Sequence, residues 1–188
     1  MQKKRILFLL ALLIFFLLIS FKITLFLGHF TPQQQNAIDY LHEETELIGN
    51  YTITEQQHMQ DVQALFRWID VVFFILFSVL ATFVYQQQKQ PREIVSLLFQ
   101  GGIGITISLF LILLLVFFAF NPMFTIFHQV FFPQGNWQFP ADSLLIQTFP
   151  LDFFFKISLG IFAQTAGWGI LFILISLYYK YASARQRD

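Results

Sequence analysis

Four long apolar runs limit what this chain can fold into more than any other feature. They lie at about residues 6–27, 69–85, 94–120 and 153–179, and each has close to the ~20 residues that a helix needs to cross a bilayer. Irregular or unpaired backbone is not tolerated against lipid, because nothing there satisfies its polar groups. We therefore predict an all-α integral membrane protein, a bundle of four transmembrane helices in a single domain over residues 1–188.

The composition agrees with this class. The chain is 56% hydrophobic, contains 27 Phe and is only 12% charged, which is not the composition of a soluble domain. The formal net charge of zero gives no indication of nucleic-acid binding. The absence of Cys excludes disulfides, thiolate catalysis and Cys-ligated metals. We interpret the first run as a retained span, because it is too long for a signal peptide and no small-residue cleavage site follows.

The distribution of Lys and Arg predicts the orientation of the spans. Only Lys22, Arg67 and Lys156 lie toward one side of the membrane. The remaining basic residues flank the opposite side, and they are Lys3, Lys4, Arg5, Lys89, Arg92, Lys180, Arg185 and Arg187. We therefore expect both termini to be cytoplasmic. The outer loops, about residues 28–68 and 121–152, are expected to form an extracellular cap.

The first outer loop shows two helix signals. Thr31-Pro32 is a good start, and helical spacing of apolar residues from Ala37 to Ile48 predicts a surface helix that Gly49 ends. Residues 52–55 then form a capping-box pattern, which starts a second helix that runs directly into the second span.

This second helix carries His58 and Asp61 on the same face as Ile69, where the membrane run begins. That face is the outward continuation of the face that packs in the bundle. The pair is therefore either a functional site above the membrane or a polar i,i+3 pair that stabilises the helix.

The stretch 121–155 is too apolar for an ordinary loop. Prolines and a glycine interrupt it too often for one membrane helix, at Pro122, Pro133, Gly135, Pro140 and Pro150. We predict an irregular segment on or in the membrane surface, walled in by the other elements. It carries His128 among aromatic residues, and Asp142 after a Trp-containing turn.

Two outer segments thus each offer a histidine and a nearby carboxylate, His58 with Asp61 and His128 with Asp142. Imidazole can take and return a proton near neutral pH, so two histidines could serve one acyl or phosphoryl centre. A metal site is less favoured, because no two histidines have i,i+3 or i,i+4 spacing. A Ser143 nucleophile lacks a strand–turn–helix context. A Phe-lined site at the outer surface suits a lipid or lipid-modified polypeptide, and the spans contain few polar residues for a transport path.

Two motifs resemble a known family. They are EQQHMQDVQALF at 55–66 and FTIFHQVFFPQGNWQFPADSLLIQTFPLDFF at 124–154. Together they are similar to the lipoprotein intramolecular transacylases, small four-helix membrane proteins that make lyso-form lipoproteins in some Gram-positive bacteria. The number, order and orientation of the spans also agree. The resemblance implies a multi-pass protein of the bacterial cytoplasmic membrane with its active site on the extracellular face.

The resemblance also implies a reaction. An acyl chain would move from the glyceryl sn-2 oxygen of a diacylglyceryl-modified lipoprotein to the α-amine of its N-terminal cysteine. Because an ester becomes an amide within one molecule, no second lipid donor and no cofactor is implied. The partners would be bacterial lipoproteins and membrane lipids.

For this reaction we expect His58 and His128 to act as base and acid, in an order that the sequence leaves open. Asp61 would orient His58, and Asp142 would orient His128 or hold the incoming ammonium. An acyl-histidine intermediate is a variant. Arg67, Trp137 or backbone N–H groups would serve the oxyanion. The expected substrate-binding residues are Glu55, Met59, Arg67 and Trp137.

Two other classes fit the composition and topology. One is a non-enzymatic membrane scaffold or accessory subunit that binds a partner through its outer loops. The other is a different lipid hydrolase or acyltransferase with the same proton-transfer groups. A scaffold should tolerate loss of His58 and His128, and substrate profiling separates the enzymes.

Overall fold

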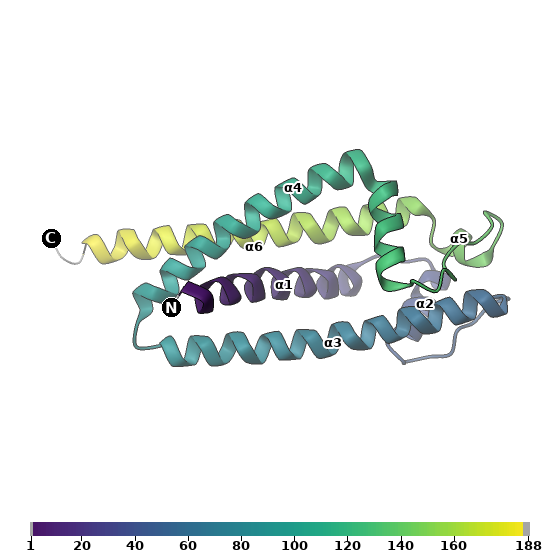
Figure 1. The fold of residues 1–188 in the computed structure, drawn as a ribbon, viewed down its shortest axis with the longest axis horizontal. Coiled ribbons are helices and arrows are strands. Elements are labelled where there is room, and N and C mark those ends of the chain that lie inside the picture. The colour runs from purple at the N-terminus through teal and green to yellow at the C-terminus, as the bar shows by residue number, and fades with distance from the viewer. Residues whose placement is uncertain (1, 186–188) are drawn as a thin grey trace. The chain divides into compact units, whose positions relative to one another are not determined.

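The computed structural model describes residues 2–185, and this range contains helices and no strand. Figure 1 shows the helices in order, which are α1 (Gln2–Leu27), α2 (Pro32–Leu41), α3 (Ile53–Gln87), α4 (Pro91–Phe131), α5 (Leu144–Thr148) and α6 (Leu151–Arg185). Helices α1, α3, α4 and α6 are long and apolar enough to cross a membrane. The prediction of an all-α chain with four such helices is confirmed. The orientation of the spans stays a prediction, and one of the basic residues on which it rests, Arg187, lies outside the described residues. The single domain also stays a prediction.

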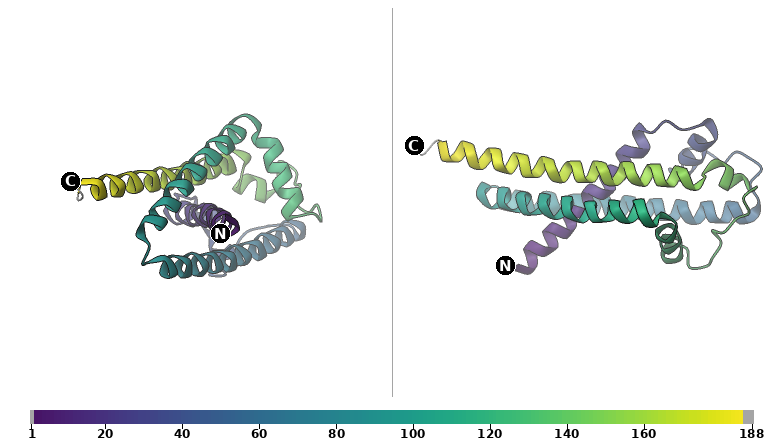
Figure 2. Two further views of the ribbon diagram at one scale, coloured as in Figure 1. Left: turned by 60° about the vertical axis from the view of Figure 1, so that its left-hand side comes forward. Right: turned by 90° about the horizontal axis from the view of Figure 1, so that it is seen from above.

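One compact unit consists of residues 2–25, 73–114 and 159–185, the apolar parts of the four long helices. Figure 2 shows α1 crossing the direction of α4 and α6 obliquely in this unit. Its core is aliphatic and aromatic, formed by Phe8, Leu12, Phe15, Leu80, Leu97, Ile105 and Leu109. Helices α4 and α6 approach closely, because a Cβ atom on Gly102 would lie 2.6 Å from the Gly169 carbonyl oxygen. Small residues at such contacts are typical of membrane helices, where packing rather than water drives association.

The second compact unit consists of residues 26–72 and 115–158. Figure 1 shows that it gathers α2, the first turns of α3, the last turns of α4, and α5. These elements surround an apolar cluster of Ala37, Leu41, Tyr51, Met59, Leu145 and Phe149. The cluster fixes the beginning of α3 against the segment that contains α5.

Both predicted helix starts are present. Thr31 and Gln34 form a reciprocal capping box at α2, and Thr52 and Glu55 form one at α3. The predicted end of α2 was wrong, because the helix stops at Leu41 rather than near residue 48.

The apolar residues after α2 have helical spacing in the sequence but lie in a loop. Glu43 adopts a positive φ of 64°, which ends the helix. Asn36 then holds the following loop, since its Nδ2 donates to the Glu46 carbonyl at 3.0 Å and its Oδ1 accepts from the Ile48 N–H at 2.8 Å. Leu47 packs on the apolar cluster from this loop, so its burial does not require a helix.

Helix α4 extends past the predicted end of the third run. The prediction of irregular backbone from residue 121 was wrong as far as Phe131. Ala119 has non-helical angles (φ −138°, ψ 36°), so two helical segments meet in a kink there. Pro122 lies in the first turn of the second segment, where its missing N–H removes no helical hydrogen bond. The kink therefore makes the proline compatible with a helix that presents His128.

Candidate functional site

The second unit brings His58 and His128 together. His58 lies in the first part of α3 and His128 in the last part of α4. Their ring centroids are 6.1 Å apart and the ring planes differ by 28°, so the imidazoles are stacked. Their side chains are buried, with only 6% and 7% of their surfaces exposed. Two titratable rings far apart in the sequence thus form one enclosed pair.

Aromatic side chains enclose this pair. Phe132 and Phe139 lie 4.9 and 5.6 Å from the His58 ring centroid. Phe124 and Trp137 lie 4.1 and 5.0 Å from that of His128. Trp137 was predicted to belong to the site, whereas the individual Phe residues could not be selected from so Phe-rich a sequence.

A pocket of about 270 Å³ lies beside the enclosure. Phe132 and Trp137 belong both to this pocket and to the rings around the histidines. The other lining residues are Gln129, Pro133, Gly135 and Gln138. The pocket therefore borders the histidine pair directly.

Hydrogen bonding sets the tautomer of His128. Its Nδ1 lies 2.8 Å from the Phe124 carbonyl oxygen, one helical turn earlier. A carbonyl can only accept, so Nδ1 carries the hydrogen and Nε2 of the neutral ring carries the lone pair. The Nδ1 of His58 and the Oδ1 of Asn136 are also buried, but neither has a hydrogen-bond partner among residues 2–185.

We expect both histidines to lie outside the membrane-spanning parts of α3 and α4, although each is on a helix that is long and apolar enough to cross. In α3 the uncharged run starts at Val71, more than three turns after His58. In α4, residues 94–119 already have the length needed to cross before the kink that leads to His128.

Burial shifts the titration of both rings. Burial lowers the pKa of His58, and the nearby His128 lowers it further, to about 4, against the opposing effects of Asp61 and Asn136. Burial also lowers the pKa of His128, against the opposing hydrogen bond to Phe124. Both imidazoles are therefore neutral at pH 7 and can accept a proton.

Asp61 acts on the site through a loop. Its Oδ2 accepts hydrogen bonds from Gln134 Nε2 at 2.8 Å and from Asn136 Nδ2 at 2.6 Å. These bonds attach the loop after α4 to α3, and they point the Asn136 amide so that its Oδ1 is left unpaired. Asp61 makes no hydrogen bond to His58 but lies close enough to raise its pKa. Sequence reasoning missed Gln134 and Asn136, since amide residues in a loop carry no distinctive signal.

Asp142 makes no hydrogen bond to either histidine within the part of the chain that the structure describes. Its side chain is exposed, and within residues 2–185 the carboxylate makes no hydrogen bond or ion pair. Only its backbone carbonyl is bonded, to Gln147 Nε2 at 3.1 Å. The expected partnership of Asp142 with His128 stays a prediction.

Glu55 is buried, with 1% of its surface exposed, and its carboxylate is fully engaged. It accepts from the Thr52 N–H and hydroxyl at 2.7 and 2.8 Å, and from the Leu145 N–H at 2.7 Å. Burial raises its pKa, but these hydrogen bonds outweigh burial and leave the pKa lowered. Glu55 thus joins the start of α3 to the start of α5, one turn before His58.

The remaining two predicted residues lie around the site rather than in it. Met59 is 3% exposed and packs in the apolar cluster of the second unit. Arg67 is exposed, forms an ion pair with Glu43 and donates to Gln63 Oε1 at 3.0 Å. Their roles in binding substrate stay predictions.

Comparison with known proteins identifies the family. The model of the family described as lipoprotein intramolecular transacylase Lit matches residues 31–154, which is more than half of the chain and contains both histidines. The chain belongs to this family. It is therefore a lipoprotein transacylase, and its four long apolar helices make it a multi-pass membrane protein. The resemblance found in the sequence is confirmed.

A solved structure agrees at the level of the fold. The membrane integral lipoprotein intramolecular transacylase Lit from Bacillus cereus is 16% identical to this chain, with 100% of each chain covered and a TM-score of 0.72. The comparison with curated proteins gave no match.

Proposed function

We propose that this transacylase moves the acyl chain from the glyceryl sn-2 oxygen of a diacylglyceryl-modified lipoprotein to the α-amine of its N-terminal cysteine. The observation that carries the proposal is the stacked, buried pair of His58 and His128 inside an aromatic enclosure. The reaction rearranges one substrate molecule, so it needs proton transfer but no second donor. The site lies in the extracellular cap, where the substrate's lipid anchor meets the membrane surface.

His128 is the base in this proposal. Its Nδ1 is fixed as a donor to the Phe124 carbonyl, which leaves the Nε2 lone pair free and stabilises the imidazolium that forms. As the amine nitrogen attacks the ester carbonyl, a C–N bond forms and Nε2 takes one amine proton. The α-amine has a pKa of about 8, so a neutral amine is accessible near physiological pH.

His58 is the acid. Burial and the nearby His128 lower its pKa to about 4, so its imidazolium is a strong proton donor, and the negative tetrahedral intermediate favours its protonation. As the C–O bond breaks, the imidazolium gives a proton to the glyceryl oxygen. This is the proton that passed from His128 to His58 after the amine attacked, so both rings end neutral, as they began, and the cycle moves one proton from nitrogen to oxygen.

Two further residues support these steps. The indole N–H of Trp137 makes no hydrogen bond within the described range 2–185, and its ring lies against His128, so it can donate to the oxyanion. The Asn136 Oδ1, which Asp61 orients through the amide nitrogen, can accept the Nδ1–H of the His58 imidazolium.

The test is mass spectrometry of the N-terminal lipopeptide from one abundant lipoprotein. The chain is expressed in a host that accumulates diacylglyceryl-cysteine with a free amine. We expect an N-acyl, S-monoacylglyceryl product of unchanged total mass with the intact chain, and none with His58→Ala or His128→Ala.

His42→Ala is the matched control. His42 makes the same kind of Nδ1 contact, to the Ile38 carbonyl at 2.9 Å, but is exposed and lies outside the enclosure. It should retain the product. Normal product from both site variants, correctly inserted, would refute the histidine mechanism. No product with the intact chain, correctly inserted, would favour a scaffold. Loss of an acyl chain without amide formation would identify a lipase.

A further inference from the structure

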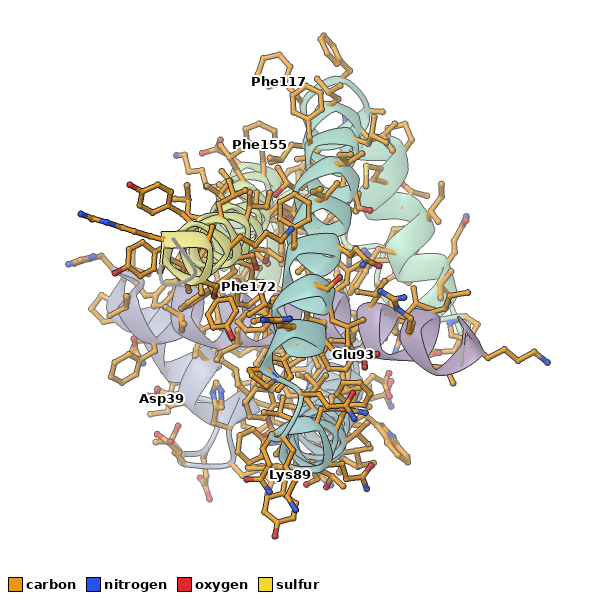
Figure 3. All side chains as sticks on the ribbon, turned by 90° about the vertical axis from the view of Figure 1, so that its left-hand side faces the viewer. Asp39, Lys89, Glu93, Phe117, Phe155 and Phe172 are labelled. Carbon is orange, nitrogen blue, oxygen red and sulfur yellow. The ribbon has the colours of Figure 1, made fainter. Side chains whose placement is uncertain are left out.

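A second pocket lies within the first unit, between the start of α4 and the end of α6. Its volume is about 300 Å³, and Arg92, Val95, Tyr179, Lys180, Ser183 and Ala184 line it. Figure 3 looks onto the side of the molecule where α6 ends and where Lys89 precedes α4. The pocket shares no residue with the histidine site.

The lining carries two positive charges that no acidic side chain of the pocket neutralises. Within residues 2–185, neither Arg92 nor Lys180 forms an ion pair, and no acidic side chain lines the pocket. The nearest acid in α4 is Glu93, which Figure 3 shows on the side of α4 toward α1 rather than toward α6. Two cations that share one pocket favour a bound anion.

The two walls of the pocket are held together by direct contacts. Ser176 Oγ donates to the Val95 carbonyl at 3.1 Å, which ties α6 to α4 at the base of the pocket. The Lys180 ammonium lies 4.2 Å from the Phe99 ring centroid, a cation–π contact that restrains its position. The Lys180 ammonium is therefore held in place before any ligand arrives.

The chemistry of the lining matches a phosphate that is attached to acyl chains. Arg and Lys bind the phosphate charge, and the hydroxyls of Tyr179 and Ser183 can donate to its oxygens. Val95 and the apolar surfaces of α4 and α6 continue from the pocket along the membrane spans. Tyr178 and Tyr181 are exposed beside it, as is typical of residues at headgroup level.

We propose that this pocket binds the headgroup phosphate of an anionic phospholipid. Basic pockets between membrane helices bind such headgroups, whereas a free phosphate would lack the apolar part of the contact. The lipid would join the end of α6 to the start of α4. This proposal is independent of the transacylase mechanism.

The test uses the full chain in detergent, titrated with a phosphatidylglycerol and with a phosphatidylcholine of the same acyl chains. Lipid retention is measured by native mass spectrometry, and thermal stability is measured in parallel. The lining variant is Arg92→Gln with Lys180→Gln. The control is Lys89→Gln with Arg185→Gln, which removes the same charge from residues that do not line the pocket.

We expect selective retention of phosphatidylglycerol by the intact chain and the control. The lining variant should bind it about 30-fold more weakly, which corresponds to ~2 kcal/mol, or about 1 kcal/mol for each basic residue. Equal binding by the two variants would overturn the proposal. If the lining variant does not fold, equal retention of both lipids by the intact chain also overturns it. Stabilisation by inorganic phosphate or glycerol phosphate to the same extent would refute a lipid source.

Discussion

Replacing Glu55 by Gln tests whether this residue positions the site or contacts substrate. The carboxylate accepts three hydrogen bonds, from the Thr52 N–H, the Thr52 hydroxyl and the Leu145 N–H. A glutamine has one acceptor oxygen, so its NH₂ group must face at least one of these donors. Hydrogen bonds to charged groups contribute about 1.5–3 kcal/mol each, and a buried N–H left unpaired costs a similar amount. We expect Glu55→Gln to lower the free energy of unfolding by about 3 kcal/mol.

The assay is unfolding in detergent, followed by tryptophan fluorescence, together with transacylase turnover. Leu145 and Phe139 share the loop region that Glu55 holds, and Phe139 packs on His58, so turnover should fall with stability. Glu44→Gln is the control, because Glu44 is exposed and its side chain makes no hydrogen bond within residues 2–185. A Glu55→Gln variant with intact stability and only a raised KM would refute this reasoning and show a direct substrate contact.

Three further predictions concern other parts of the structure. The free energy of unfolding should fall by up to about 3 kcal/mol as the pH drops from 6.5 to about 4, because His58 in the unfolded chain takes up a proton that the folded ring does not. His58→Asn should flatten this part of the pH–stability curve. Asp61→Asn should weaken one of its two loop hydrogen bonds, with a loss of about 1–2 kcal/mol in unfolding free energy and a lower pKa for His58, readable by NMR. Gly102→Ala should destabilise the fold by about 1–3 kcal/mol in thermal unfolding, because the new Cβ meets the Gly169 carbonyl. Gly104→Ala is the control, since a Cβ there meets open space, and it should be neutral or stabilising.

The parts of the fold that could be predicted are those that local physics decides. Bilayer length requires four long helices, and the capping chemistry at Thr31 and Thr52 sets where two helices begin. The end of α2 was wrong because Leu47 has helical spacing but reaches the apolar cluster from a loop that Asn36 holds. The helix around Pro122 was missed because a kink at Ala119 is invisible in the sequence. In both cases a tertiary contact or a change of direction overrides the local pattern.

The candidate site, too, could be predicted from the sequence only in part. Residue types identified His58 and His128, because few titratable side chains occur in so apolar a chain. The approach of the two rings depends on long-range packing, which the sequence does not show. The same holds for Glu55, which the sequence suggested as a substrate contact and which accepts a hydrogen bond from Leu145 of the chain itself. Asn136 could not be found at all, since its importance comes from its position between Asp61 and His58.

The enclosure explains how the proposed reaction avoids hydrolysis. Water is the competing nucleophile for an ester carbonyl, and both histidines would activate it as readily as an amine. Rings of Phe124, Phe132 and Trp137 cover the pair, and only 6% of the His58 surface and 7% of the His128 surface are exposed to water. The amine has no such barrier, because the substrate itself carries it to the ester. Excluding water and holding the amine near the ester therefore act together. The protein then needs only neutral proton-transfer groups at the point where the amine meets the ester carbonyl.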